Sequence, residues 1–243
     1  MRLIAAHIRV TLLGLVRSPA YWVPTLLFPT MLYLFFGARV AAPDAAGFAL
    51  ASWSVYAVLG VAFYQFGVGV AQDRESPWDA YLRILPAGSL PPLAAQIVVA
   101  TLFAIAAVLI LWAVAGQVAG IDLDLRARVR LGLVLAAGAA PFALFGIALG
   151  YLVSAKAAVP VANMLFLPLA FAGGLWLPPS QLPGIAAEVS PWLPTRHFGE
   201  LAWAAVAGYA APVASCLWLA GYTAAFAALA VWARRRDQGR RYA

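Results

Sequence analysis

Long runs without a charged residue dominate the sequence. Each run reaches the ~20 apolar residues that a helix needs to cross a bilayer, and none shows the short alternating segments of a membrane β-strand. The charge-free windows are 18–38, 45–72, 84–121, 131–155, 157–187 and 201–233. They predict an all-α integral membrane protein with six transmembrane helices, at about 19–40, 48–72, 91–119, 131–153, 158–177 and 209–233.

Composition agrees with this pattern. Of the 243 residues, 10% are charged and 65% are hydrophobic, whereas soluble proteins carry about 25% charged residues. Neither an internal repeat nor a low-complexity linker divides the chain. We therefore expect one membrane domain over residues 1–243.

The first seventeen residues differ from the spans that follow. Arg2, Arg9 and Arg17 interrupt the apolar run that a signal peptide requires. Apolar side chains recur near helical spacing at Leu3, Ala6, Val10, Leu13 and Val16. Residues 1–17 thus favour an interfacial helix on the inner membrane surface, with a frayed cytoplasmic tail as the alternative.

The net charge of +7 reflects basic residues at the two ends of the chain. Basic flanks of spanning helices orient a protein with those flanks in the cytoplasm, so we expect both termini there and no nucleic-acid partner. Six spans then leave eleven Lys and Arg residues inside and five outside. The outer loop 121–130 is an exception to this rule, because it carries Arg126, Arg128 and Arg130 on the outside.

A short charged segment, 73–88, separates the second and third predicted spans. Ser76 can cap a helix and Pro77 suits its first turn, while Pro86 and Gly88 would end it. These signals predict a helix at about 76–86, with an apolar stripe of Trp78, Tyr81, Leu82 and Leu85. Because so short a helix is marginal alone, it must pack on the lipid interface, on other helices of the chain or on a partner protein.

The segment after the fifth predicted span is broken by proline. Residues 178–199 contain Pro178, Pro179, Pro183, Pro191 and Pro194, which interrupt regular helix. They also keep several large apolar side chains. We expect one or two short helices against the outer face of the membrane, which suggest an outer gate, with a packed extracellular loop as the alternative.

Several chemistries have no counterpart in this sequence. The single lysine, Lys156, lies in no phosphate-binding loop, and no His, Cys or carboxylate cluster has metal-ligand spacing. The spanning windows contain no Asp, Glu, Lys, Arg or His, which disfavours a proton- or sodium-driven carrier. We expect no enzyme activity and no cofactor in this chain.

The two unusual segments together resemble the permease subunit of a type-2 ATP-binding-cassette (ABC-2 type) exporter. Glu75, Leu82 and Pro86 hold positions of the family's cytoplasmic signature, although Pro77 and Trp78 replace its usual Gly-Thr. The outer signature is matched by Gly173, Gly174, Pro178, Leu182 and Pro183, with Ala172 in place of the common Ser. In the family this region forms re-entrant outer helices that help close the exit. The resemblance covers nearly the whole chain.

The resemblance implies that segment 76–86 is a coupling helix that docks on a separate P-loop ATPase, which binds ATP and Mg. The implied ATPase-coupling residues are Glu75, Trp78, Asp79, Tyr81, Leu82, Leu85 and Pro86. It also implies a second permease chain, identical or related, and alternating access in the bacterial inner membrane. The outer residues Gly173, Gly174, Pro178, Leu182 and Pro183 would form the outer gate.

In the family the second and fifth spans line the pathway. Their polar side chains here are Tyr56, Tyr64, Gln65, Gln72 and Asn163, and Gln65 and Gln72 stand seven apart, on one helical face. Hydrogen bonding between helices is the alternative role. Such an uncharged lining suits an amphipathic or hydrophobic cargo such as a drug, antibiotic or lipid.

Other interpretations stay open. Within the family the cargo could be a polysaccharide, a haem-pathway component or sodium, and outside it the chain could be a passive channel or scaffold without an ATPase. The small-residue pattern Gly146-Ile-Ala-Leu-Gly150 permits close helix approach. We expect that approach to lie within one chain rather than between copies.

Overall fold

The computed structural model describes residues 2–38, 43–76 and 90–241, and within these ranges the chain is helical and contains no strand. The long elements are α1 (Arg2–Val16), α2 (Pro19–Leu32), α3 (Pro43–Val61), α4 (Gly69–Glu75), α6 (Leu90–Ala119), α7 (Leu125–Leu152), α8 (Ala155–Ala172) and α11 (Val213–Arg241). Two π-helices, η1 (Tyr33–Gly37) and η2 (Ala62–Val68), continue α2 and α3. The short outer elements are η3 (Pro179–Gln181), α9 (Gly184–Val189), η4 (Ser190–Trp192) and α10 (Pro194–Ala207).

Five helical stretches of the described chain are long and apolar enough to cross a membrane. They are Ala45–Glu75, Ala94–Ala119, Leu125–Leu152, Ala155–Ala172 and Val213–Gln238, and they match the second to sixth predicted spans. The first predicted span corresponds to α2 and η1, whose apolar stretch Trp22–Gly37 is shorter than 18 residues. A multi-pass membrane protein is therefore confirmed, and the first of the six predicted spans stays a prediction.

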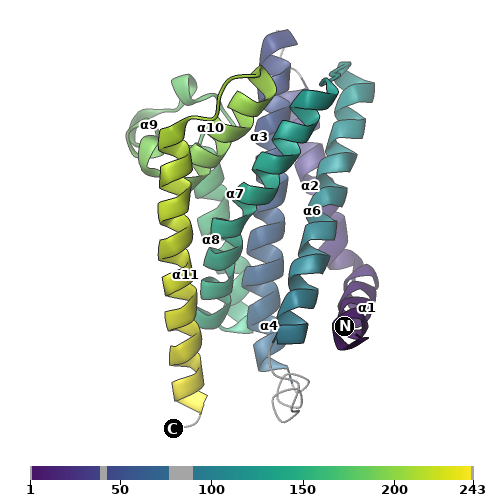
Figure 1. Ribbon diagram of the computed structural model, residues 1–243, viewed down its shortest axis with the longest axis vertical. Coiled ribbons are helices and arrows are strands. Elements are labelled where there is room, and N and C mark those ends of the chain that lie inside the picture. Colours follow the sequence, from purple (N-terminus) through teal and green to yellow (C-terminus); the bar gives the residue numbers. More distant parts are fainter. Residues whose placement is uncertain (1, 39–42, 77–89, 242–243) are drawn as a thin grey trace.

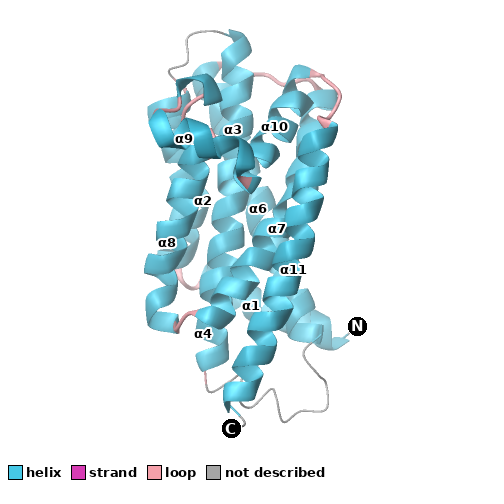
Figure 2. Ribbon diagram, turned by 90° about the vertical axis from the view of Figure 1, so that its left-hand side faces the viewer, coloured by secondary structure: helices cyan, strands magenta, loops and turns pink. Residues whose placement is uncertain are grey.

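The bundle has two distinct ends (Figures 1 and 2). Both termini, the end of α4 and the junction between α7 and α8 lie toward one end, the lower one in Figure 1. The α6–α7 loop and residues 173–212 lie at the other. We call these the inner and outer ends, after the predicted orientation, which itself stays a prediction.

Several boundaries differ from the sequence prediction. Helix α7 begins at Leu125 rather than at residue 131, so the three arginines of the predicted 121–130 loop lie on its first turns. Asp124 caps this helix by accepting a hydrogen bond from the Ala127 amide at 2.8 Å. Helix α10 continues to Ala207 and ends at Gly208, whose φ is 78°. The broken outer segment is thus longer than 178–199, and α11 starts at Val213 rather than at residue 209.

The second span forms the centre of the bundle. Of its most apolar window 83% is buried, against 17% for α11. Trp53, Tyr56 and Phe63 are each at most 2% exposed. The helices at the periphery of the bundle place apolar side chains on the surface, which is the arrangement expected of a chain surrounded by lipid.

Close packing of α7 on the second span depends on two glycines. A Cβ on Gly146 would lie 2.7 Å from the Ala62 carbonyl oxygen, and one on Gly150 would lie 2.8 Å from the Gly67 carbonyl oxygen. Both carbonyls belong to the π-helix η2. The small-residue pattern therefore serves packing within one chain, as the sequence predicted.

The two amides that stand seven residues apart on the second span differ in exposure. Gln65 lies in η2 and is buried, whereas Gln72 lies in α4 and is exposed. The role of both residues in the pathway stays a prediction.

Helix α1 covers Arg2–Val16 of the predicted N-terminal helix at 1–17. Ile8, Leu12 and Leu15 of α1 pack against a cluster that includes Val99 and Phe103 of α6. The apolar residues Val10, Leu13 and Val16 instead stay exposed. They are free to contact lipid, and the contact itself stays a prediction.

Candidate functional site

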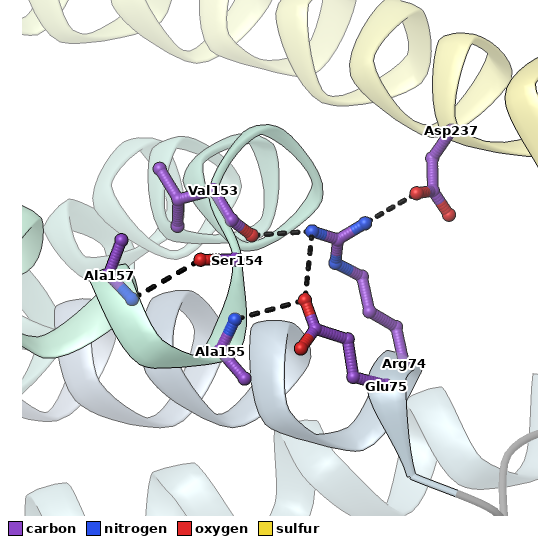
Figure 3. Close-up of polar contacts among 7 residues, drawn as sticks. All are labelled: Arg74, Glu75, Val153, Ser154, Ala155, Ala157 and Asp237. Atoms are coloured by element: carbon purple, nitrogen blue, oxygen red, sulfur yellow. Dashed lines mark hydrogen bonds and ion pairs between the residues drawn. The ribbon is translucent and has the colours of Figure 1, made fainter.

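Arg74 ties three helices together at the inner end (Figure 3). It lies in the last turn of α4, and its Nη1 donates a hydrogen bond to Oδ1 of Asp237 on α11. Its Nη2 donates to the carbonyl oxygen of Val153, directly after α7. The planar guanidinium can make both bonds at once because its donors form a rigid fork. We call Arg74, Glu75, Val153, Ala155 and Asp237 the Arg74 junction.

Glu75 holds the start of α8. Its Oε1 accepts a hydrogen bond from the Ala155 amide at 3.0 Å and lies 3.7 Å from Nη2 of Arg74. Ser154 caps the same helix by accepting a bond from the Ala157 amide at 3.4 Å. A carboxylate at a helix N-terminus also interacts favourably with the helix dipole. The first residue of the cytoplasmic signature is therefore bound to the α7–α8 junction.

The other predicted coupling residues lie outside the described residues. They are Trp78, Asp79, Tyr81, Leu82, Leu85 and Pro86. Ser76 is described: its backbone is extended, with φ −77° and ψ 146°, and its hydroxyl donates to the Asp73 carbonyl oxygen at 2.7 Å. The coupling helix at 76–86 stays a prediction.

Two of the predicted pathway residues contact each other. The Tyr64 hydroxyl donates a hydrogen bond to Oδ1 of Asn163 at 2.6 Å, which joins the second and fifth spans. The backbone carbonyl of Gln65 accepts a bond from Nε2 of Gln96 at 2.9 Å. Gln72 lies apart from them and is exposed. For Tyr64 and Asn163 the structure supports the interhelical hydrogen bond.

Tyr56, the remaining pathway residue, belongs to an aromatic cluster. Its ring centroid lies 4.7 Å from that of Phe166 and 5.3 Å from that of Trp53. Trp176 packs on the same group, at 5.8 Å from Trp53. The cluster joins the second and fifth spans below the outer segment. The sequence singled out only Tyr56, although Trp53 stands three residues earlier on the same helix.

The outer signature residues bend the chain after α8. Gly173 ends this helix, and a Cβ on it would lie 2.6 Å from the Thr195 Cβ. Thr195 is fully buried and donates a hydrogen bond to the Leu169 carbonyl oxygen at 2.6 Å. Gly174 has a φ of 82°, which favours glycine. The α10 start is thereby fixed against the α8 end.

The remaining signature residues shape the short helices. Pro178 precedes η3 and Pro183 precedes α9, both as N-cap residues. Leu182 between them is buried. The structure thus has short helices in the proline-rich segment. Their function as a gate stays a prediction.

Comparison with known proteins shows the family to which the sequence belongs. The family described as ABC-2 type transporter matches residues 2–206. The chain belongs to the ABC-2 type transporter family. A Bacillus subtilis (strain 168) protein named "Putative transport permease YvfS" is 27% identical over 219 residues, which cover 88% of this chain and 89% of that protein. No solved structure matches the chain.

The resemblance found in the sequence is thereby confirmed. Membership in this family indicates a transport subunit rather than an enzyme. Permeases of this family normally work with an ATPase, which implies a partner protein.

The sequence missed a polar cluster at the outer end of this ABC-2 permease. The Ser215 hydroxyl of α11 donates to Oε2 of Glu200 at 2.5 Å, and Arg196 donates to Oε1 at 2.8 Å. His197 is buried, with Nδ1 3.3 Å from the Ser215 hydroxyl oxygen and its ring stacked on Trp218. These contacts hold α10 on α11. The i,i+4 spacing of Arg196 and Glu200 was the available signal.

The charge of Glu200 is favoured by this cluster. Partial burial alone would raise the pKa of the carboxyl group, but the hydrogen bonds from Ser215 and Arg196 and the positive charge of Arg196 outweigh it, so the pKa is lowered. Among the described residues, no group of three His, Cys, Asp or Glu side chains could hold a metal ion. The cluster therefore serves as a contact between helices.

Proposed function

We propose that the chain is the membrane subunit of an ATP-driven exporter in the bacterial inner membrane. Two permease chains, identical or related, would form the pathway, and two copies of a separate P-loop ATPase would bind ATP and Mg. The observation that carries this proposal is the family match over residues 2–206 in a chain whose sequence has no phosphate-binding loop.

The ATPase would dock on segment 76–86, which directly follows α4. The support is the sequence signature at Glu75, Leu82 and Pro86 together with the position of Glu75 at the inner end. The Arg74 junction binds α4 to α7, α8 and α11 at that point. A displacement of the docking segment would therefore act on several spans at once.

The proposed cargo is amphipathic or hydrophobic. Two features of the second and fifth spans support this choice: the aromatic cluster around Tyr56 and the uncharged Tyr64–Asn163 pair. Aromatic faces and neutral hydrogen-bonding groups suit a drug-like molecule or lipid better than an ion. Alternating access would move this cargo toward the outer segment.

Transport by inside-out membrane vesicles tests the proposal. Vesicles that contain the chain and its ATPase would receive an amphipathic fluorescent dye, a fluorescent phospholipid or radioactive sodium, with and without ATP. We expect ATP-dependent accumulation of the dye or the lipid, and none when the phosphate-binding lysine of the ATPase is replaced by Ala. Equal passage without ATP would indicate a passive channel instead. ATP-dependent accumulation of sodium alone would support an ATP-driven exporter but would contradict the proposed amphipathic or hydrophobic cargo.

A further inference from the structure

Arg74 lies in the last turn of α4, where it connects the second span to other parts of the bundle at the inner end. One arm of its guanidinium reaches α11 through Asp237, and the other reaches the α7–α8 junction through the Val153 carbonyl (Figure 3). Glu75, the next residue, holds the first amide of α8. Two consecutive side chains of one helix thus fasten it to three others.

The Arg74–Asp237 pair is largely removed from water. The side chains of Arg74 and Asp237 are 13% and 9% exposed. A buried ion pair adds little net stability compared with apolar side chains of similar volume, whereas loss of one partner leaves an unpaired charge. Such a pair holds two elements in one register more effectively than it stabilises the fold.

The sequence around Asp237 supports a specific role. Asp237 is the only acidic residue after Glu200, and it stands among five arginines, at positions 234–236, 240 and 241. A surface acid in that run would be expected to pair with its own helix. Asp237 is buried and accepts a hydrogen bond from Arg74, which stands 163 positions earlier.

We propose that Arg74 is a positioning residue that transmits displacement of the inner end of the second span to α11, through Asp237, and to the α7–α8 junction, through Val153. This inference rests on the proposed function, since the displacement would come from the ATPase. Without the pair, the second span moves and α11 does not follow. ATP hydrolysis then continues while the far helix keeps its resting position.

The test measures a distance that spans the junction. Cys216 is the only cysteine, so a Cys216→Ser background allows spin labels at Arg9→Cys on α1 and Gln238→Cys on α11, both exposed positions. The purified complex with its ATPase, in lipid nanodiscs, is measured by pulsed electron resonance without nucleotide and after trapping with ATP and vanadate. We expect a nucleotide-dependent shift in this distance for the native pair.

Variants of the pair decide the inference. Arg74→Ala and Asp237→Asn should abolish the shift while the ATPase still co-purifies, and Arg74→Asp combined with Asp237→Arg should restore at least half of it. Arg74→Lys keeps the charge without the two-armed bond, and we expect a reduced shift. If Arg74→Ala binds the ATPase and shows an undiminished distance shift, this inference is overturned, whereas the proposed function is not affected.

Two further outcomes are separable. If no ATPase co-purifies with the native chain, the proposed function fails and this inference fails with it. If the Ala variant does not fold, Arg74→Lys and the exchanged pair carry the test, because both keep opposite charges at the two positions. An exchanged pair that folds, binds the ATPase and shows no shift would contradict transmission through this pair.

Discussion

The hydroxyl of Tyr64 donates a hydrogen bond to the side-chain oxygen of Asn163, 2.6 Å away, and so connects the second and fifth spans. Interhelical hydrogen bonds in membrane proteins contribute about 0.5–1.5 kcal/mol each. We therefore expect Tyr64→Phe to lower the free energy of unfolding by about 1 kcal/mol, with a similar coupling energy in a double-mutant cycle with Asn163→Ala. Reversible unfolding in mixed detergent micelles measures both quantities.

Gln72→Ala is the matched control for this pair. Gln72 is a polar residue of the same span but is exposed, so its replacement should change stability by less than about 0.5 kcal/mol. A coupling energy of zero between Tyr64 and Asn163 would show that their hydrogen bond does not stabilise the contact between the two spans. These residues would then be free to serve the pathway alone.

Much of the fold followed from the pattern of charge-free windows. Hydrophobic length predicts a spanning helix because lipid forces the backbone to satisfy its own hydrogen bonds. The same criterion placed the start of α7 too late, since Arg126, Arg128 and Arg130 count against a span although a helix can carry them outside the membrane. The Asp124 cap was the better signal for that boundary.

Less of the candidate site followed from the sequence. The sequence could not assign residues to the faces of the second span, because the π-helix η2 changes the number of residues per helical turn there. No local sequence signal predicts this π-helix. The Arg74–Asp237 pair joins residues 163 positions apart, and charge composition alone does not select one arginine among many. The family pattern singled out Glu75 and Gly173, which make contacts between helices in the structure, and their coupling and gating functions stay predictions.

Replacing Gly146 with Ala should destabilise the bundle. The added methyl would lie 2.7 Å from the Ala62 carbonyl oxygen, which belongs to backbone and cannot rotate away. Overpacking of this kind costs about 1–3 kcal/mol, measurable as a lower melting temperature in detergent. Gly132→Ala on the same helix is the control, since no atom lies within 4 Å of its Cβ position. Equal melting temperatures for the two variants would show that α7 does not pack closely on η2.

The outer segment should depend on the contact between Gly173 and Thr195. Gly173→Ala places a methyl group against the buried Thr195 side chain, so we expect α10 to loosen from α8. Hydrogen exchange of amides in residues 194–207 should become at least tenfold faster. Gly221→Ala serves as the control, because it adds a methyl group in open space on α11. Unchanged exchange in Gly173→Ala would contradict this role.

Glu200 predicts a pH dependence of stability. Its pKa in the folded chain is lowered from the ordinary value of 4.5, so its ionised form is stabilised by folding. That stabilisation is complete above the ordinary pKa and is lost as pH falls through the lowered value. Thermal unfolding between about pH 7 and pH 3 should therefore show native protein more stable than Glu200→Gln at pH 7, with the gap closing in acid.

The outcome that would contradict this prediction is a gap that stays constant over the whole pH range. The stabilisation would then come from packing rather than from the charge that Ser215 and Arg196 stabilise. Ser215→Ala offers a second check, since loss of its hydrogen bond should raise the pKa of Glu200. In this background, the pH-dependent difference in stability between the chain with Glu200 and the chain with Glu200→Gln should become smaller.

The central claim is that this ABC-2 permease receives its energy from a separate ATPase at the segment after α4. The direct measurement is purification of the tagged chain from its native membrane in mild detergent, with mass spectrometry of the proteins that accompany it. We predict a P-loop ATPase in equimolar amount, lost with Leu82→Asp and retained with Ile185→Asp, which changes an exposed residue at the outer end. Purified chain that carries no ATPase, or an ATPase that stays bound to Leu82→Asp, would contradict the account.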